Sequence, residues 1–475
     1  MSEGTAKTAP PAALTPDICV IGAGANGIAV ATAAAAFGVS VVLVERGETG
    51  GSRAPLAART LIEAAALAQT MRKGGAPALP APFHDHVRRV LSAEAIDTTE
   101  ERLKALGIVI VRGTARFSSR STVMVGDQAI KARRFVIATG GRPAAPDLPG
   151  LDSVSVLSED DLAGLTRLPE RPIVLGGDGM ATALAQAMQR LGSTVSLVAP
   201  EGLMPEHDAE AVNITRRRLL REGLAIHEGH GPLRAERSRT GLRLVLSTPE
   251  GEKVVKGSQL FIAAPRRPEI GGLELDLAGI RHDATGILVD KSLRTANRRV
   301  YALGGCAGGV GAAASGQAGD DHVGLILRSI LFRQPVRIDP ASYPRIAPCQ
   351  PEIAAIGLSE DAARAKAGTI RVLRWPFAEI AGARMAGEAD GFIKLVTDAK
   401  GRLLGVTIVA EGAGELIAPW CVAVKAGIDA AAMAGIAMPA LGRSQASRRV
   451  ALSFHASTAA SPRIRRLIGF LRRFG

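Results

Sequence analysis

The stretch that decides the fold is DICVIGAGANGIAVATAAAAFGVSVVLVE, residues 17–45. A short apolar run is followed by the glycines Gly22, Gly24 and Gly27, then by an alanine-rich segment and a second apolar run that ends at Glu45. Apolar runs of this length are typical of buried strands, and the alanine-rich segment between them is typical of a helix. The sequence therefore predicts a strand, a glycine turn, a helix and a second strand.

The positions of the glycines and of the acid indicate what this βαβ unit binds. Gly22 permits a tight turn, Gly24 lets backbone approach a pyrophosphate, and Gly27 lets the helix pack closely on the strand. The helix N-terminus then offers N–H groups and a positive dipole end to phosphate oxygens. Glu45 is placed to accept hydrogen bonds from ribose hydroxyls. The whole arrangement predicts a dinucleotide-binding Rossmann domain.

A second segment, RPIVLGGDGMATALAQAMQRLGSTVSLVA at residues 171–199, repeats this layout and predicts a second nucleotide-binding-type domain. Its glycine fingerprint is incomplete in both alignments, which are Gly176, Asp178 and Ala181, and Gly177, Gly179 and Thr182. A carboxylate at Asp178 would repel a pyrophosphate. Ala199-Pro200 stands where an NAD site has an acid and an NADP site has arginines nearby. Binding of NADH or NADPH by this turn is therefore left open.

The composition indicates a globular α/β protein. The chain has 475 residues, an apolar share of 47% and 54 glycines without a fixed period, which excludes collagen-like and wholly disordered chains. A chain of this length predicts roughly two to four domains. The four cysteines, at positions 19, 306, 349 and 421, have no CxxC spacing, so they predict neither a disulfide framework nor a metal knuckle.

Charge and the N-terminus narrow the choice of location and partner. The formal charge of +13 allows an anionic partner, but an aromatic content of 3% disfavours nucleic acid. Residues 1–16 lack the charged and apolar regions of a secretory signal. We therefore expect a flexible N-terminus and a cytoplasmic protein.

The order of the two units, followed by FVIATGGRPAAPDLPGL (135–151) and YALGGCAGG (301–309), resembles the pyridine nucleotide-disulfide oxidoreductases, and in particular the mercuric reductase and dihydrolipoamide dehydrogenase branch. PRIAPCQPEIAAIGLSEDAARA (344–365) and ADGFIKLVTDAKGRLLGVTIVAEGAGELI (389–417) are similar to that family's dimerisation domain. The resemblance implies a homodimer with FAD, two Rossmann-like domains and a C-terminal α+β domain.

The resemblance also implies a division of the chain. An FAD-binding domain would comprise residues 17–150 and 275–335, an NAD(P)-binding-like domain residues 151–274, and a dimerisation domain residues 341–455. A basic amphipathic tail would follow at 462–475.

The positions that match the family's FAD site are the dinucleotide turn, the ribose acid, the double glycine of the redox helix, the ATG turn and the GD motif. They read Gly22, Gly24, Gly27, Glu45, Gly50, Gly51, Ala138, Thr139, Gly140 and Gly305. The GD motif is Gly304-Gly305 here, so the aspartate that would hold the sugar chain of the flavin is replaced.

The family's thiol chemistry is missing. Arg53 and Ala58 occupy the positions of its two redox cysteines, and neither can form the thiolate that a dithiol relay needs. The family's C-terminal histidine and glutamate read Met438 and Gln445, and neither side chain titrates. A glutamate of the second Rossmann helix reads Ala183. The sequence therefore predicts a divergent member without the redox cysteine pair and the His-Glu dyad.

The eight histidines do not form a convincing metal site. His84 with His86, and His227 with Glu228 and His230, lack further ligands at suitable spacing, so surface histidines are the better interpretation.

The C-terminal tail has helical periodicity. Its apolar positions lie on one predicted face and are Ile464, Leu467, Ile468, Leu471 and Phe474. Much of the rest is basic and consists of Arg463, Arg465, Arg466, Arg472 and Arg473. Such a helix could lie on an anionic bilayer or dock on the body of the protein, and nucleic-acid binding is a weaker third alternative.

Two functions fit these observations. The first is an FAD oxidoreductase that passes electrons from reduced flavin directly to a small or membrane-borne acceptor, with NAD(P)H as one candidate donor. The alternative is a catalytically degenerate scaffold that acts as a binding or assembly partner at a membrane.

Overall fold

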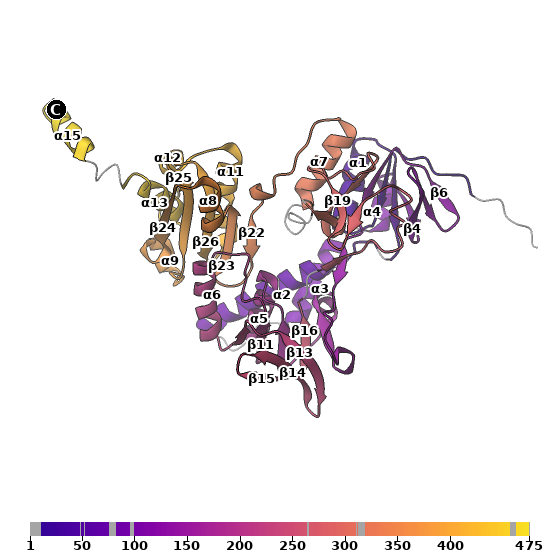
Figure 1. Cartoon of the computed structure of the whole chain (residues 1–475), viewed down its shortest axis with the longest axis horizontal. Helices are drawn as coiled ribbons and strands as arrows, with labels where there is room; N and C mark the ends of the chain where they lie inside the picture. Colours follow the sequence, from indigo (N-terminus) through magenta and orange to yellow (C-terminus); the bar gives the residue numbers. More distant parts are fainter. Residues whose placement is uncertain are drawn as a thin grey trace, which may run out of the picture.

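The computed structural model describes residues 11–47, 49–51, 53–75, 82–95, 99–263, 266–309, 311, 319–456 and 462–474. Figure 1 shows three lobes and a separate C-terminal helix. Two lobes contain a mainly parallel sheet and the third an antiparallel one. The predicted α/β fold, with two Rossmann-like domains and a C-terminal α+β domain, is confirmed.

The first lobe is built on a parallel sheet of order β20-β7-β1-β2-β3. Its strands are β1 (Ile18–Ile21), β2 (Val41–Glu45), β3 (Val109–Arg112), β7 (Arg134–Ile137) and β20 (Val300–Ala302). Helices α1 (Ala25–Ala36) and α7 (Gly319–Leu331) pack on one face. All four residues of β1 are buried, which is why this strand is apolar throughout.

A smaller antiparallel meander also belongs to this lobe. It consists of β4 (Ala115–Ser119), β5 (Thr122–Val125) and β6 (Gln128–Ile130). Leu14 pairs with its last strand, because the Leu14 N–H donates to the Ala129 carbonyl at 2.9 Å. The part of the expected flexible N-terminus next to Leu14 is therefore tied to the sheet, while residues 1–10 lie outside the described residues.

The second lobe repeats the plan with a parallel sheet of order β12-β11-β10-β16-β9. Its strands are β9 (Val156–Ser158), β10 (Pro172–Leu175), β11 (Ser196–Ala199), β12 (Ala225–Glu228) and β16 (Gln259–Ile262). Helices α5 (Gly179–Arg190) and α6 (Ala209–Arg221) follow β10 and β11. An antiparallel sheet covers the other face and comprises β13 (Pro232–Ser238), β14 (Gly241–Thr248) and β15 (Gly251–Gly257).

The third lobe is an antiparallel sheet of order β22-β23-β26-β25-β24. The strands are β22 (Arg345–Ala347), β23 (Glu352–Gly357), β24 (Ile370–Pro376), β25 (Phe392–Asp398) and β26 (Leu403–Ala410). Helices α11 (Ala418–Ala426), α12 (Ala430–Gly435) and α13 (Gln445–Ser453) pack on it. The indole of Trp420 is fully buried among them and donates to the Ser447 hydroxyl at 3.0 Å.

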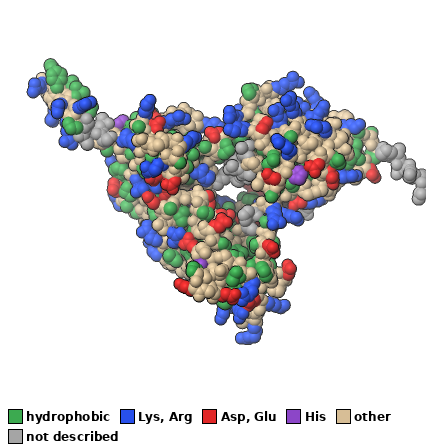
Figure 2. Space-filling model, in the orientation of Figure 1, with side chains coloured by type: hydrophobic (Ala, Val, Ile, Leu, Met, Phe, Trp, Pro, Cys, Tyr) green, Lys and Arg blue, Asp and Glu red, His purple; other side chains and the backbone are tan. Residues whose placement is uncertain are grey.

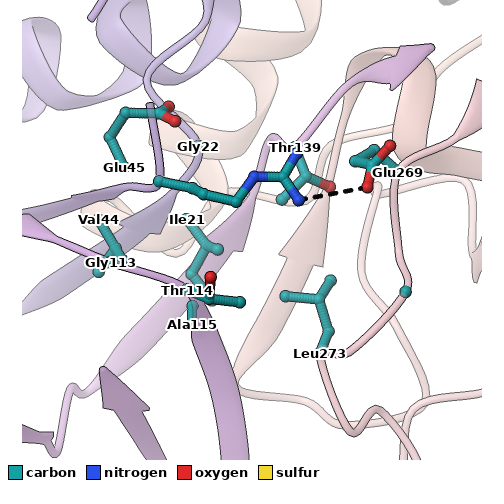
Figure 3. Close-up of a pocket in the computed structure, with 12 residues that line it drawn as sticks. Ile21, Gly22, Val44, Glu45, Gly113, Thr114, Ala115, Thr139, Glu269 and Leu273 are labelled. Atoms are coloured by element: carbon teal, nitrogen blue, oxygen red, sulfur yellow. Dashed lines mark ion pairs between the residues drawn. The ribbon is translucent and has the colours of Figure 1, made fainter. Parts of the chain in front are cut away.

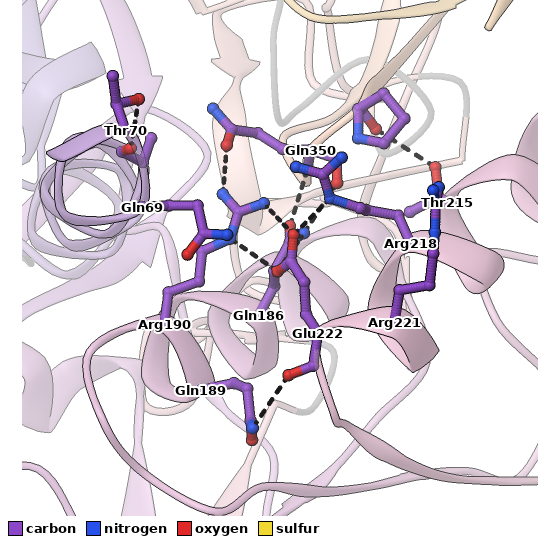
Figure 4. A network of polar contacts seen from close by, with 12 residues as sticks. Gln69, Thr70, Gln186, Gln189, Arg190, Thr215, Arg218, Arg221, Glu222 and Gln350 are labelled. Carbon is purple, nitrogen blue, oxygen red and sulfur yellow. Dashed lines mark hydrogen bonds and ion pairs between the residues drawn. The ribbon is translucent and has the colours of Figure 1, made fainter. Parts of the chain in front are cut away.

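Helix α2 (Ala54–Lys73) joins the lobes, because its alanine-rich face packs against α5 in one apolar cluster. A polar network lies at the end of this contact (Figure 4). The side chains of Arg190 and Glu222 are 3% and 9% exposed and form an ion pair of 2.7 Å. Arg218 donates to the same carboxylate, and Arg190 also reaches the side chain of Gln350 in the third lobe. The network therefore couples the second and third lobes.

Glu222→Gln should lower the free energy of unfolding by about 3–5 kcal/mol, because it leaves the buried Arg190 charge without its counter-charge. Burial alone would raise the pKa of Glu222, but hydrogen bonds from Arg190 and Arg218 lower it. The wild type should thus keep this contribution above the ordinary glutamate pKa and lose it as the pH falls through the lowered value. Urea unfolding at several pH values measures both effects.

The matched control is Glu170→Gln, since Glu170 pairs with Arg167 on the surface, where the two side chains are 77% and 83% exposed. It should unfold like the wild type. Equal stabilities of the two variants would contradict a structural role for the network.

Candidate functional site

The glycine turn after β1 is fixed by backbone contacts. Gly22 has φ +104°, and a Cβ there would lie 2.5 Å from the carbonyl oxygen of Ala138. A Cβ on Gly27 would lie 1.9 Å from the carbonyl oxygen of Gly22. Neither position can carry a side chain, so the turn brings β1, α1 and the end of β7 together only with glycine.

The N-terminus of α1 is open. Gly24 is its N-cap residue, no side chain caps the helix, and no acid lies in its first turn. A Cβ on Gly24 would meet no atom within 4 Å, whereas a Cβ on Gly51 would lie 2.7 Å from the Gly24 Cα. The Gly50 N–H donates to the Ala23 carbonyl at 2.9 Å. The double glycine therefore lies directly beside a helix end that is suited to an anion.

Glu45 lies beside a small cavity at the end of β2 (Figure 3). Its carboxylate accepts the Ala23 N–H at 2.6 Å and the Gly47 N–H at 2.8 Å. The cavity has a volume of about 80 Å³. Its lining includes Gly22, Glu45, Gly113, Thr114, Thr139 and Leu273. Arg46 and Glu269 also line it and form an ion pair of 3.5 Å.

The turns of the ATG and GD motifs meet nearby. A Cβ on Gly305 would lie 3.2 Å from the carbonyl carbon of Gly140, and Gly305 itself is exposed. The ATG turn and the GD turn, which lacks the family's aspartate, therefore pack closely against each other. Thr139 lines the cavity and Ala138 supplies the carbonyl that faces Gly22. The structure thus brings the sequence-predicted positions of the first unit into one region.

The N-terminus of α5, in contrast, is occupied by the protein itself. Asp178 is its N-cap residue and accepts the Ala181 N–H at 2.8 Å. Glu206 accepts the Gly179 N–H at 3.3 Å. Burial raises the pKa of Asp178, as does the charge of Glu206. Two of the N–H groups that a pyrophosphate would use therefore already have acceptors. Glu206 was missed from the sequence, because it follows α5 by many residues.

A cavity of about 280 Å³ remains beside this turn. Asp178, Glu201 and Glu206 line it together with Gly176 and Gly177, and no lysine or arginine of the described chain does so. On the other side, a Cβ on Gly179 would lie 2.7 Å from the Cβ of Ala347, so this glycine serves contact with β22. The cavity is therefore acidic, and its residues do not fit a dinucleotide.

Arg53 and Ala58, the two positions that the resemblance assigns to redox cysteines, have different surroundings. Arg53 precedes α2 and is exposed. Ala58 is completely buried, and it shares one apolar cluster with Ala183 of α5. Both alanines thus belong to the helix contact that joins two lobes. Ser52, which follows the double glycine Gly50-Gly51, lies outside the described residues.

All four cysteines of the described chain are free thiols, and Cys19, Cys306 and Cys349 are buried. Burial raises the pKa of the Cys349 thiol to about 12 and also raises that of Cys306. Inert thiols of this kind are typical of structural cysteines.

The side-chain amide of Gln445 forms structural hydrogen bonds with backbone carbonyls. Its amide nitrogen donates to the carbonyl oxygens of Met438 and Pro439, both at 2.9 Å. A carboxylate could not donate these bonds. The substitution from glutamate therefore suits the loop before α13.

The histidines do not converge on a cation. Within the described ranges, no three His, Cys, Asp or Glu side chains gather as metal ligands. Burial lowers the pKa of His227, while His84 lies 3.5 Å from Asp85.

Over the described residues, no helix is long and apolar enough to cross a bilayer.

Comparison with known proteins identifies the family of this chain. It matches the model of the pyridine nucleotide-disulphide oxidoreductases over residues 16–319 and that of their dimerisation domain over residues 343–441. The mercuric reductase of Streptomyces lividans is 31% identical over 474 residues, which cover 93% of this chain and 97% of the relative. The dihydrolipoyl dehydrogenase of Thermus scotoductus is 30% identical over 439 residues, which cover 87% and 92%.

Solved structures share the fold. LpdA from Mycobacterium tuberculosis has a TM-score of 0.81 at 23% identity and covers 93% of this chain and 99% of its own. The HOCl-induced flavoprotein disulfide reductase RclA from Escherichia coli has a TM-score of 0.78 at 21% identity, with 92% and 99% covered. The predicted family is confirmed: this chain belongs to the pyridine nucleotide-disulphide oxidoreductases, which are FAD-dependent oxidoreductases.

Proposed function

We propose that this protein passes electrons from reduced FAD directly to a small or membrane-borne acceptor, without a dithiol relay. The observation that carries the proposal is the open N-terminus of α1 beside a redox helix that has no thiol at Arg53 or Ala58. Bound FAD supplies two-electron redox chemistry that needs no cysteine. The chain itself would bind and orient the cofactor.

The residues that fit FAD come from the first lobe. The N–H groups at the start of α1 would hold the pyrophosphate, and Glu45 would accept ribose hydroxyls. The Ala23 N–H on Glu45 fixes that carboxylate beside the turn. We therefore assign the cofactor to Gly22, Gly24, Gly27, Glu45, Gly50, Gly51, Ala138, Thr139, Gly140 and Gly305.

We also propose a homodimer in the cytoplasm, in contact with the inner face of the membrane. The match to the family's dimerisation domain supports the homodimer. The domain division at residues 150, 274 and 341 is part of this proposal.

The second lobe bears on the choice of electron donor. Asp178 and Glu206 occupy N–H groups of α5 and make the adjacent cavity acidic. Both features oppose binding of a nicotinamide dinucleotide at Gly176, Gly177 and Gly179. We therefore expect NADH and NADPH to be poor donors.

Gly24→Ala should fold normally but lose FAD, with affinity reduced about tenfold or more. The added methyl group meets no protein atom within 4 Å, so it obstructs only the approach of a phosphate to the backbone. The measurement is the flavin-to-protein ratio from the absorbance spectrum, beside the melting temperature.

Gly435→Ala is the control, because a Cβ at Gly435 in α12 also meets no atom within 4 Å. Full flavin content in the Gly24 variant would overturn the assigned cofactor site. Wild-type protein purified without a flavin band, and unable to take up added FAD, would instead favour the non-catalytic scaffold.

Electron transfer from chemically reduced holoenzyme to a soluble quinone should survive thiol alkylation within about twofold, since Cys19, Cys306 and Cys349 are buried and the proposed route uses no thiol, that of the half-buried Cys421 included. Anaerobic stopped-flow absorbance follows reoxidation of the flavin before and after treatment with N-ethylmaleimide. Abolition of the reaction by alkylation, with flavin content unchanged, would contradict the direct route.

Combining Asp178→Gly with Glu206→Gln should strengthen NADH binding about tenfold or more, because it frees two N–H groups and removes two negative charges. Titration calorimetry measures the affinity, and anaerobic bleaching of the flavin reports electron transfer. Asp429→Gly with Glu415→Gln is the control, since Asp429 caps α12 through the Ala432 N–H at 2.8 Å. Rapid bleaching of the wild-type flavin by NADH would refute the expectation that NADH is a poor donor.

A further inference from the structure

Helix α15 (Pro462–Leu471) is a separate basic and apolar element at the C-terminus. Residues 462–475 contain five arginines and no acid. No residue of the helix is buried, and Figure 1 shows it projecting beyond the third lobe. The alternative in which its apolar face docks on the body of the same chain is therefore not what the structure shows. Gly475 lies outside the described residues.

The apolar side chains of this helix are large and open to solvent. Leu467, Ile468, Phe470 and Leu471 are 51%, 50%, 54% and 55% exposed, and the adjacent Phe474 is 74% exposed. The rings of Phe470 and Phe474 meet edge to face at 5.0 Å. Figure 2 shows these hydrophobic side chains next to blue arginines on the same helix. A group of adjacent exposed apolar side chains of this kind is typical of an interaction surface.

A second surface of the same composition lies on the first lobe. Phe37 follows α1 and Phe332 follows α7, and both are more than half exposed, at 60% and 54%. Their rings meet edge to face at 5.5 Å. Arg328, Arg333 and Arg337 are exposed around Phe332 in the chain. We call Phe37, Phe332 and these three arginines the aromatic patch.

In the view of Figure 1, α15 and helices α1 and α7 all lie toward the upper edge of the molecule. Figure 2 shows lysine and arginine side chains along the upper edge of the first lobe. Among the described residues, Arg328 donates to the Gly324 carbonyl at 3.4 Å, and none of the three arginines forms an ion pair with a carboxylate. Their charge is therefore available to an anionic partner.

We propose that α15 and the aromatic patch bind the surface of an anionic phospholipid bilayer. Arginines attract acidic headgroups, while leucine, isoleucine and phenylalanine side chains enter the boundary between headgroups and acyl chains. A nucleic acid would use the arginines alone and leave the apolar side chains in water. The joint presence of both kinds of side chain therefore favours lipid.

This inference deepens the proposed function, because it names the surface from which a membrane-borne acceptor would reach the protein. The lipid-binding inference does not depend on whether the flavin passes electrons to an acceptor. Lipid binding and flavin chemistry can be measured separately on the same full-length holoenzyme.

The test is sedimentation with vesicles of phosphatidylcholine alone or mixed with phosphatidylglycerol. The wild type should bind only the anionic vesicles, and salt should weaken binding. Arg472→Gln with Arg473→Gln should weaken it on the order of 25-fold, at roughly fivefold for each arginine. Arg237→Gln with Arg239→Gln removes the same charge from the exposed end of β13 and the turn that follows it, and should bind like the wild type.

Two further variants test the apolar contribution. Leu467→Ser with Phe470→Ser keeps every charge and should lose most of the binding, and Phe332→Ser should weaken it while α15 is intact. Three outcomes would overturn the proposal: no binding of the wild type to anionic vesicles, equal losses in the two double-arginine variants, or full binding after the serine substitutions. Loss of the dimer on deletion of residues 462–475 would also overturn it, since α15 would then serve the partner subunit.

Flavin content and reduction of a soluble quinone are recorded for every variant. Normal values with lost vesicle binding support the lipid role, whatever the membrane-borne acceptor is. Absent quinone reduction in a wild type that still binds vesicles would refute only the proposed function.

Discussion

The nucleotide-binding half of the molecule depends on one constraint, the contact of backbone with backbone at the Gly22 turn. Ala138 lies so close that a Cβ on Gly22 would stand 2.5 Å from its carbonyl oxygen, and Gly27 meets Gly22 even more tightly. Because no side chain fits, the first turn of α1 is held directly over the ends of β1 and β7. The open N–H groups and the carboxylate of Glu45 take their positions from this contact.

The two Rossmann-like lobes use the same geometry with opposite results. At α1 the helix end is left uncapped, which costs stability in the absence of a ligand and favours an anion. At α5 the side chain of Asp178 caps the helix, and such a cap contributes about 1 kcal/mol to folding. A capped helix end is stable without a ligand, so the second lobe can keep its fold with no nucleotide bound.

Much of the fold could be predicted because its signals are local. Glycine spacing and apolar runs predicted both βαβ units, and Asp178 was recognised as unfavourable to a phosphate. The sequence could not show that Asp178 caps α5, or that Glu206 joins it from a distant loop. The bonds from Gln445 to the carbonyls of Met438 and Pro439 and the pairing of Leu14 also depend on tertiary contacts. Periodicity predicted the amphipathic tail but not whether its apolar face is covered.

The packing around Ala58 agrees with the proposed electron route without a dithiol relay. Ala58 and Ala183 lie in one apolar cluster, where α2 and α5 approach each other through small side chains. A cysteine restored at Ala58 would lie in surroundings that disfavour a thiolate, as burial does at Cys349. It would also enlarge a side chain in a close helix contact, and overpacking of that kind destabilises a core. A dithiol relay at this place would therefore require several coordinated changes, which agrees with the proposed electron route that uses no thiol.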